Sequence, residues 1–511
     1  DIDTNGETTV FETAGNEIGD TGGNGGALQV VANSVIELGT AIGHLSTVFD
    51  TSTVSADANG VLIAGDITIK PSANFTSGTI TLIDGDADNI STTEQADILV
   101  QDTALTDFTV TAGAQDVTIA AAAKSDTATA SELSVTNNMA KGLRQAIEAV
   151  ASDSSALAVL NNSLVGINGK STSDATAIAK QAAPQTELTA GSSVAAQSVT
   201  GSVQGVMSSR MASLRSGDAY FGTGVAAGGM SAQSGFIQVF GSTAEQESTK
   251  VGSGTQSGFD TETQGLAIGF DGVTDDGMTV GVSVATANTD VDGLGTGKAK
   301  NSIDTYSASI YMDRATDTGY VEGSLTYGIN ENSTSRVVNA SGIDTRTLTG
   351  SYDSQSVSLS VSAGVPNEVG AGYLTPFGSF TASFMDIDAY TEKSTVADDA
   401  LRLKVAQDDI NSMIGTVGVK FHGEMSNGGI PMISLAINNE FGDNTINTNN
   451  TYQGGGTGFV TTTAVEELSA TLGLGYTYGT DASSIEFAYE ADANDDDYLS
   501  HYGSVKIVSK F

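Results

Sequence analysis

The chain has 511 residues, and its 61 acidic and 20 basic side chains give it a net charge of −41 at pH 7. Nucleic-acid phosphates bind clusters of Lys and Arg, so this acidity excludes a nucleic-acid partner. The length allows two or more structural units, and no apolar run reaches the roughly eighteen residues of a membrane helix. Two features fit export: the chain has no Cys, and it begins at Asp1 without Met, as after removal of a signal peptide.

The first part of the chain, residues 1–137, is acidic and rich in short strand-like runs. Residues 1–25 are polar and Gly-rich, which predicts a disordered or partner-held arm. From about residue 28, runs such as LQVVANSVIEL, GVLIAGDITI and GTITLID are bounded by Gly, Asp, Asn or Ser turns. Spacing of this kind, without a fixed motif, indicates imperfect rungs of a β-solenoid or a small sandwich. We interpret 1–137 as one β-rich, solenoid-like unit.

One acidic turn in this unit has the rhythm of a calcium-binding loop. Asp84, Asp86 and Asp88 alternate within DGDADN. A calcium loop needs Gly at its sixth position and Glu at its twelfth, where this chain has Asn89 and Gln95. A plain acidic turn is the preferred interpretation and calcium the alternative ligand; no other metal or cofactor is predicted.

Residues 138–193 change to helical spacing. The segment NNMAKGLRQAIEAVAS places Met139, Leu143, Ile147 and Val150 three or four residues apart. SSALAVLNNSLVG and TSDATAIAKQAAPQ continue the tendency, and Pro184 then interrupts it. We interpret this region as a linker of short helices.

The segment 194–214 is a longer amphipathic helix, within a unit that we bound at 194–234. Its apolar face is made by five residues: Val199, Val203, Val206, Met207 and Leu214. The remaining positions are mostly small. About twenty residues at ~1.5 Å each span ~30 Å, the thickness of a bilayer's hydrocarbon core. We expect the helix to thread the bore of the barrel described next; a helix outside the barrel mouth is the alternative.

Residues 235–511 alternate between apolar and small polar side chains. In 356–365 and 467–478, Val, Leu, Ala or Tyr fills every second position, with Ser, Thr, Gly or Glu between them. This period indicates half-buried strands. A soluble β-sandwich alternates in the same way, so alternation alone leaves both folds open.

The connections favour a membrane barrel. We predict twelve strands, at 235–243, 261–271, 278–288, 302–313, 319–330, 351–365, 370–386, 410–421, 430–441, 465–478, 484–491 and 498–511. Long polar connections alternate with short turns: the long ones are 244–260, 289–301, 331–350, 387–409 and 442–464. Only the acidic ADANDDDY is short on the long-loop side. This rhythm is typical of an outer-membrane barrel, here with twelve antiparallel strands.

Charged residues in the predicted helix need partners in a lumen. We expect Arg210 and Arg215 to meet acidic side chains on the polar strand faces. The candidates are Glu440, Glu467, Glu486 and Glu490.

These segments resemble the translocator of an autotransporter, the type Va secretion family. The resemblance covers 138–511 and is carried by QAAPQTELTAGSSVAAQSVTGSVQGVMSSRMASLR, FIQVFGS at 236–242, GFDTETQGLAIGFD at 258–271 and GMTVGVSVATANTDVDG at 277–293. It implies a twelve-stranded barrel plugged by a helix, an upstream passenger at the cell surface, and assembly by the barrel assembly machinery with periplasmic chaperones. It says nothing about 1–137.

The end of the chain resembles the family's assembly signal with one departure. Val505, Ile507 and Phe511 match the alternating hydrophobic positions, and Ser509 does not. Some relatives cut themselves at a paired Asn in the lumen helix. No Asn lies between Val194 and Arg215, so we predict that the passenger stays attached.

The leading functional hypothesis is an outer-membrane protein that exports and displays a short non-enzymatic passenger on the cell surface. Its expected neighbours are outer-membrane lipid and lipopolysaccharide, with self-association or surface-layer packing through the N-terminal region. The alternative is a porin for passive diffusion. A surface enzyme is the third hypothesis; residues 1–137 contain no recognisable nucleophile, base and orienting group.

Overall fold

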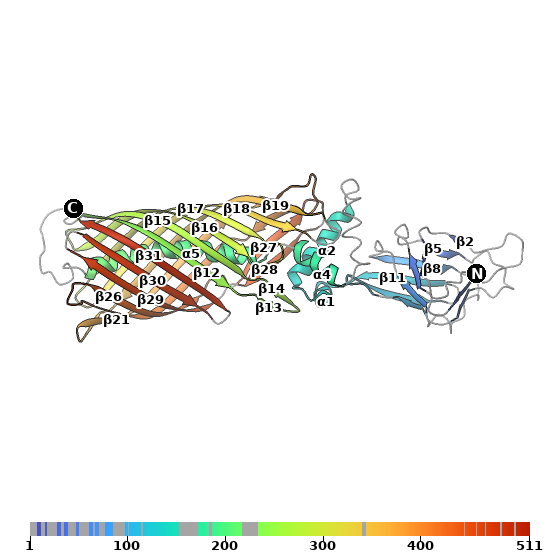
Figure 1. Ribbon diagram of the computed structural model, residues 1–511, viewed down its shortest axis with the longest axis horizontal. Coiled ribbons are helices and arrows are strands. Elements are labelled where there is room, and N and C mark those ends of the chain that lie inside the picture. Colours follow the sequence, from blue (N-terminus) through green and yellow to red (C-terminus); the bar gives the residue numbers. More distant parts are fainter. Residues whose placement is uncertain are drawn as a thin grey trace, which may run out of the picture.

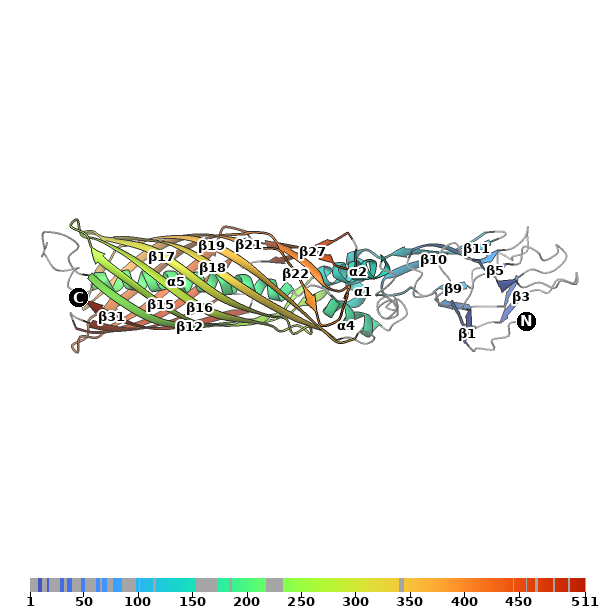
Figure 2. The same cartoon turned by 90° about the horizontal axis from the view of Figure 1, so that it is seen from above.

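The computed structural model of the protein has three parts along one long axis (Figures 1 and 2). Strands of the N-terminal region lie at one end, short helices follow, and a long barrel containing a helix occupies the rest. The described residues are 8–11, 16–17, 28–31, 35–38, 47–50, 61–64, 67–70, 77–84, 98–100, 102–113, 116–152, 172–182, 186–216, 233–339, 344–443, 445–455, 457–464, 467–480, 483–494 and 497–510.

The N-terminal strands form a parallel solenoid. Each strand pairs in parallel with the strand three positions later: β1 with β4 and β4 with β7, β2 with β5 and β5 with β8, and β3 with β6. This confirms the solenoid-like prediction. The strands are β1 (Thr8–Phe11), β2 (Asn16–Glu17), β3 (Leu28–Val31), β4 (Val35–Leu38), β5 (Thr47–Asp50), β6 (Val61–Ala64), β7 (Ile67–Lys70), β8 (Gly78–Asp84) and β9 (Ile98–Val100).

Two details of this region differ from expectation. Strands β1 and β2 lie within the predicted arm 1–25, because pairing with β4 and β5 supplies hydrogen bonds that the local composition does not reveal. An antiparallel hairpin of β10 (Thr106–Ala112) and β11 (Asp116–Ala123) then joins the edge of β8. It ends the parallel stacking on the side that faces the helices (Figure 1).

The helical region forms a cap, which we define as α1 (Asp126–Leu133), α2 (Asn137–Ser152) and α4 (Thr172–Ala182). Helix α1 was not predicted. Its N-terminus is marked by Ser125, whose Oγ accepts a hydrogen bond from the Ala128 N–H at 3.1 Å, and it ends at Ser134 in the left-handed conformation. SSALAVLNNSLVG and Pro184 lie outside the described residues.

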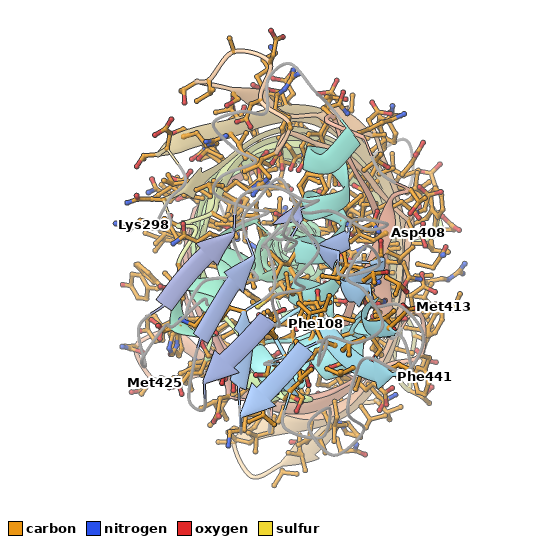
Figure 3. All side chains as sticks on the ribbon, turned by 90° about the vertical axis from the view of Figure 1, so that its right-hand side faces the viewer. Phe108, Lys298, Asp408, Met413, Met425 and Phe441 are labelled. Atoms are coloured by element: carbon orange, nitrogen blue, oxygen red, sulfur yellow. The ribbon has the colours of Figure 1, made fainter. Side chains whose placement is uncertain are left out.

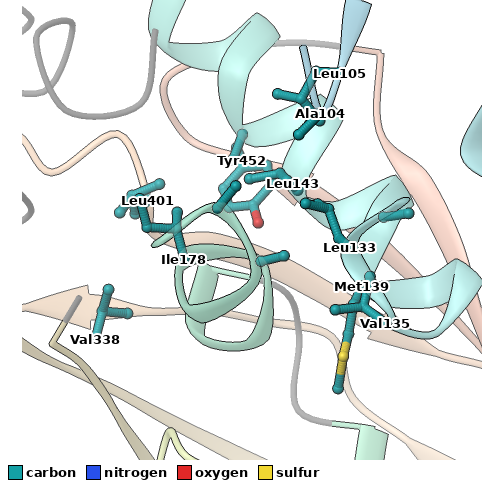
Figure 4. Close-up of a cluster of buried hydrophobic side chains, with 14 of the residues drawn as sticks. Ala104, Leu105, Leu133, Val135, Met139, Leu143, Ile178, Val338, Leu401 and Tyr452 are labelled. Atoms are coloured by element: carbon teal, nitrogen blue, oxygen red, sulfur yellow. The ribbon is translucent and has the colours of Figure 1, made fainter. Parts of the chain in front are cut away.

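The cap shares an apolar core with the end of the barrel that faces the N-terminal strands. Leu143 of α2 and Ile178 of α4 are fully buried there with Leu401, and Tyr452 contributes its ring (Figure 4). Fully burying a Leu or Ile side chain stabilises a fold by about 1.5–3 kcal/mol. The predicted linker is therefore a packed unit that covers one end of the barrel.

The barrel has the predicted twelve antiparallel strands. Each pairs with its neighbours, and β31 pairs with β12 to close the wall. The strands are β12 (Gln233–Gln246), β15 (Phe259–Val273), β16 (Met278–Gly293), β17 (Lys300–Ala315), β18 (Tyr320–Val338), β19 (Arg346–Gly364), β21 (Gly372–Ile387), β25 (Ile410–Gly423), β26 (Ile430–Glu440), β29 (Leu468–Gly479), β30 (Ser483–Ala493) and β31 (Tyr498–Lys510).

The predicted long loops are largely ordered strand. Most of 331–350 belongs to β18 and β19, which extend beyond the expected ends at 330 and 351. Other loop residues form β13 (Thr249–Val251), β14 (Gly254–Gln256), β22 (Tyr390–Thr391), β23 (Lys393–Ser394), β24 (Leu403–Gln407), β27 (Thr445–Tyr452) and β28 (Phe459–Ala464). The two longest of these, β27 and β28, are rich in Asn or Thr and lack the continuous apolar face that marks a membrane strand. We call the sheet of β22, β24, β27 and β28 the lid sheet.

The two faces of the wall divide as expected. Apolar side chains such as Ile310, Leu359 and Ile437 are exposed on the outside, and Met413 and Phe441 lie on the outer rim in the end-on view of Figure 3. Small polar side chains such as Thr263 and Ser309 are buried inside. An apolar outside with a polar inside suits strands in lipid. Within the part of the chain that the structure describes, every helix is too short or too polar to cross a membrane.

Candidate functional site: the lumen and its helix

The lumen is occupied by helix α5, which spans Thr186–Ser216. Its 31 residues at ~1.5 Å each extend about 46 Å, so the helix runs the length of the barrel (Figures 1 and 2). It begins eight residues before the predicted start at 194, beside the cap. The helix enters from the end that carries the cap and runs toward the end where the chain terminates.

The apolar face of α5 leans on one side of the lumen. Val199, Val203, Val206 and Met207 are buried, and so is Met211. Their partners on the wall are Phe236, Phe240, Ala267, Ala285, Ala287, Tyr311 and Val508. The side chain of Leu214, the remaining residue of the predicted face, is not among those described. These wall residues lie on β12, β15, β16 and β17, with Val508 on β31 across the closing seam.

Glycines in the wall make room for aromatic rings between wall and helix. The Phe236 ring lies over Gly269, the Phe240 ring over Gly265 and the Tyr311 ring over Gly281. A Cβ atom at any of these glycines would overlap the ring. The rings therefore lie flat on the wall, which keeps the bore wide enough for a helix.

The strongest polar contact of α5 is a buried ion pair. Arg210 donates from Nε to Asp271 Oδ2 at 2.6 Å and from Nη2 to Oδ1 at 2.8 Å. The exposed fractions of the two side chains are 2% and 1%. Asp271 also accepts from Tyr311 at 2.9 Å and from Ser234 at 2.6 Å, and Arg210 contacts the Ser234 hydroxyl. Four groups from α5, β12, β15 and β17 thus meet at one point.

The expected acidic partners of Arg210 were wrong. The apolar face of α5 turns Arg210 toward β15, whereas Glu440, Glu467 and Glu490 lie along a cavity on another side of the helix. Glu486 instead pairs with Lys506 of β31 at 2.7 Å, and the Lys506 ammonium also donates to Ser209 of α5 at 2.8 Å. The side chain of Arg215 is outside the described set.

Smaller polar side chains hold the rest of α5. Gln204 donates to Ser358 at 2.6 Å, Ser208 donates to Glu322 at 2.7 Å, and Asn301 donates to Ser192 at 3.0 Å. These bonds reach β17, β18 and β19. The small polar wall predicted from the sequence therefore provides the helix with hydrogen-bond partners along its length.

A cavity of about 480 Å³ remains beside α5. Gly201 and Gly205 of the helix face it, and a Cβ atom at either position would meet no heavy atom within 4 Å. On the opposite side it is lined by carboxylates of Glu440, Glu467, Glu490 and Asp492. The helix is thus packed tightly on one side and loosely on the other.

This asymmetry predicts opposite effects for alanine at glycines of the same helix. Gly201→Ala and Gly205→Ala each raise the free energy of unfolding by about 0.5–1 kcal/mol, because Ala removes the backbone-entropy cost of Gly in a helix. Gly191→Ala lowers it, since the new Cβ would lie 2.6 Å from Val291 Cγ1 and 2.9 Å from Phe259 Cγ. The unfolding temperature of the detergent-solubilised protein measures both; shifts of the same sign would contradict the packing.

The mouth of the lumen at the cap end is closed by the cap and the lid sheet. Two buried ion pairs fix the loops there: Arg336 contacts Glu392 at 2.7 and 2.9 Å, and Arg346 contacts Asp399 at 2.9 Å. Burial raises the pKa of the Tyr452 phenol, which keeps this ring uncharged beneath the cap. The lumen is therefore covered at the end that faces the N-terminal region.

The other sequence-predicted residues do not join the lumen. Val505 and Ile507 lie on the outer face of β31, with Ile507 exposed, and Phe511 is outside the described residues. Asp84 ends β8, and Asp86 and Asp88 are not described. Sequence reasoning missed Asp271, Lys506 and Glu322. Each is a charged residue at an inward position of a strand, and that was the available signal.

Three comparisons bear on this arrangement. The family described as "Autotransporter beta-domain" matches residues 235–490, half of the chain. Among solved structures, the translocator domain of the autotransporter NalP from Neisseria meningitidis is 18% identical, covers 61% of this chain and 98% of its own, and has a TM-score of 0.45. The transport unit of AIDA-I from Escherichia coli is 13% identical, covers 60% of this chain and 98% of its own, and has a TM-score of 0.39. The β-domain of the Bordetella autotransporter BrkA is 17% identical, covers 54% of this chain and 99% of its own, and has a TM-score of 0.37. Among curated proteins none matches the sequence.

Proposed function

This chain belongs to the autotransporter β-domain family, and from that premise we propose that its barrel exports and anchors the N-terminal region as a passenger on the cell surface. Members of this family have an outer-membrane barrel that serves as a translocator domain and has no enzymatic activity of its own. We propose the following units: passenger 1–137, linker 138–193, lumen helix unit 194–234 and barrel 235–511.

The path of the chain is the observation that carries this proposal. The N-terminal strands lie beyond one end of the barrel, and α5 connects that end to the first barrel strand through the lumen (Figure 1). A chain threaded in this way places its N-terminal part on one side of the membrane and its barrel within it. The cap packs on the same end, so the passenger side of the lumen is also its covered side.

We propose a passenger that acts by binding and not by catalysis, and that stays attached to the barrel. The lumen helix supports attachment, because its ends are held by separate contacts: Gly191 fits against Phe259 and Val291 near one end, and Arg210 pairs with Asp271 near the other. The proposed neighbours are outer-membrane lipid, lipopolysaccharide, the barrel assembly machinery and periplasmic chaperones. Self-association or surface-layer packing through the N-terminal region is part of the same proposal.

Surface exposure is tested by single cysteines, since the natural chain has none. Thr109→Cys lies on an exposed position of β10, and Asp317→Cys lies in an exposed turn at the opposite end of the barrel. In intact cells a membrane-impermeant maleimide should label Thr109→Cys and should not label Asp317→Cys. After lysis it should label both variants. The label should run on a gel with the full-length chain. Labelling of Asp317→Cys alone would reverse the orientation, and a separate small labelled fragment would contradict attachment.

A porin remains the alternative function. The cavity beside α5 is lined by carboxylates, so a pore there would favour cations. The helix takes up much of the bore and the cap covers one end, so such a pore would be narrow.

A further inference from the structure

The outer wall of the barrel has an apolar groove over β25, β26, β29 and β30. Its volume is about 610 Å³. Its sides are mainly Val417, Leu435, Ile437 and Leu472, and its floor includes Ala470, Ala491 and Ala493. Elsewhere on these strands the outward positions carry larger side chains, such as Phe421, Ile433 and Leu474. The groove exists because small side chains replace large ones at neighbouring outward positions.

Strand register shows how these residues line up. One outward row runs Val417, Ile437, Ala470 and Ala493 from β25 to β30. The next row runs Val419, Leu435, Leu472 and Ala491. In both rows the side chain on β30 is Ala, while Leu435 and Ile437 on β26 are 57% and 54% exposed. The groove therefore deepens toward β30.

The second row then leaves the apolar belt. After Ala491 it continues to His501 on β31, Thr243 on β12 and Glu262 on β15. The change from Ala to His, Thr and Glu marks the level where lipid tails give way to headgroups. These residues lie in the halves of β31, β12 and β15 nearest the cap end. On the proposed orientation the groove thus opens to the outer leaflet.

A hydrogen-bonded pair stands at this boundary. The Tyr489 hydroxyl and His501 Nδ1 are 2.7 Å apart, and their rings are stacked at 6.0 Å. Both side chains project outward, and His501 is directly opposite Ala491, the floor of the groove. The second imidazole nitrogen has the chemistry to bond an oxygen of a headgroup. An apolar channel that ends at such a pair matches a molecule with a hydrocarbon chain and a polar head.

We propose that this groove is a binding site for one acyl chain of lipopolysaccharide, with a headgroup oxygen on the Tyr489–His501 pair. The proposal rests on the outer orientation of the cap end. The groove is continuous with the lipid-facing belt, so its occupant is a membrane lipid, and its position near the outer headgroup level selects the outer-leaflet lipid. Hydrocarbon that fills the groove makes close contacts that a flat wall does not offer, which favours this position over the rest of the belt.

Filling the groove tests the proposal. Ala470→Leu with Ala491→Leu occupies the floor, whereas Ala382→Leu adds the same side chain to the outer face of β21, between Leu359 and Met413, as a matched control. Native mass spectrometry of purified full-length protein should show retained lipopolysaccharide for the natural chain and the control. Retention should fall about ten-fold in the filled variant. Added lipopolysaccharide should raise the unfolding temperature of the first two proteins only.

Three results would overturn the proposal. Phosphatidylethanolamine that is retained, and that raises the unfolding temperature, as well as lipopolysaccharide does would remove the selection for the outer-leaflet lipid. A natural chain that forms a dimer, together with a filled variant that is a monomer, would make the groove an interface between copies. Retention unchanged by filling would place the lipid elsewhere. A reversed orientation in the cysteine-labelling experiment would contradict the proposed function. The lipid measurements would then still report whether the groove binds a lipid.

Discussion

Arg210→Met should lower the free energy of unfolding by about 3–5 kcal/mol, because it leaves the Asp271 carboxylate buried without its charge partner. Ser234 and Tyr311 would still donate to Asp271, but two neutral donors do not replace a guanidinium that makes two bonds. The effect is measured by the temperature or denaturant concentration at which the folded, fast-migrating form disappears on SDS gels.

Two further variants separate charge from shape. Arg210→Met combined with Asp271→Asn should recover most of the loss, since no buried charge remains and the amide keeps bonds to Ser234 and Tyr311. Arg314→Ala breaks the exposed pair of Arg314 with Asp276, whose side chains are 58% and 60% exposed, and should leave stability unchanged. A single Arg210→Met variant as stable as the natural chain would show that α5 does not depend on this pair.

Removing the lumen helix should raise single-channel conductance in planar bilayers on the order of ten-fold, because a wet lumen of small polar side chains then spans the membrane. The variant lacking residues 1–216 loses α5, and the variant lacking 1–185 keeps it while losing the passenger and cap. The natural chain and the second variant should both conduct weakly.

The two truncations identify what closes the lumen. If the variant lacking 1–185 conducts as strongly as the one lacking 1–216, the cap and not the helix is the barrier. If the natural chain itself conducts at the level of the open barrel, the porin hypothesis replaces the export hypothesis. Migration of each variant as a folded barrel on unheated SDS gels is the control for assembly.

The barrel strands could be predicted because one physical pattern repeats along them. Val357, Leu359 and Val361 alternate with Ser in β19, and a strand with lipid on one side and a lumen on the other requires this alternation. The lid strands β27 and β28 escaped prediction since both faces of each strand carry Thr, joined by Asn in β27. Outside the membrane a strand is held by backbone pairing, which does not require an apolar face.

The lumen contacts could be predicted only in part. Period 3.6 identified the buried face of α5 from Val199, Val203, Val206 and Met207, because apolar side chains on one side of a helix need a partner. The partner of Arg210 could not be chosen in this way. Asp271 and Glu440 are both inward carboxylates of the barrel, and the choice depends on which wall the helix leans against.

The sequence by itself determined the twelve-stranded wall and the helix that enters it, since each depends on a local period of side chains. Only the tertiary structure decided that α1, α2 and α4 close one end, that Arg210 meets Asp271, and that Ala470, Ala491 and Ala493 line one groove. These features join residues far apart in the chain. Such contacts follow from strand register and from the rotation of α5 in the bore, and neither is encoded in a local pattern.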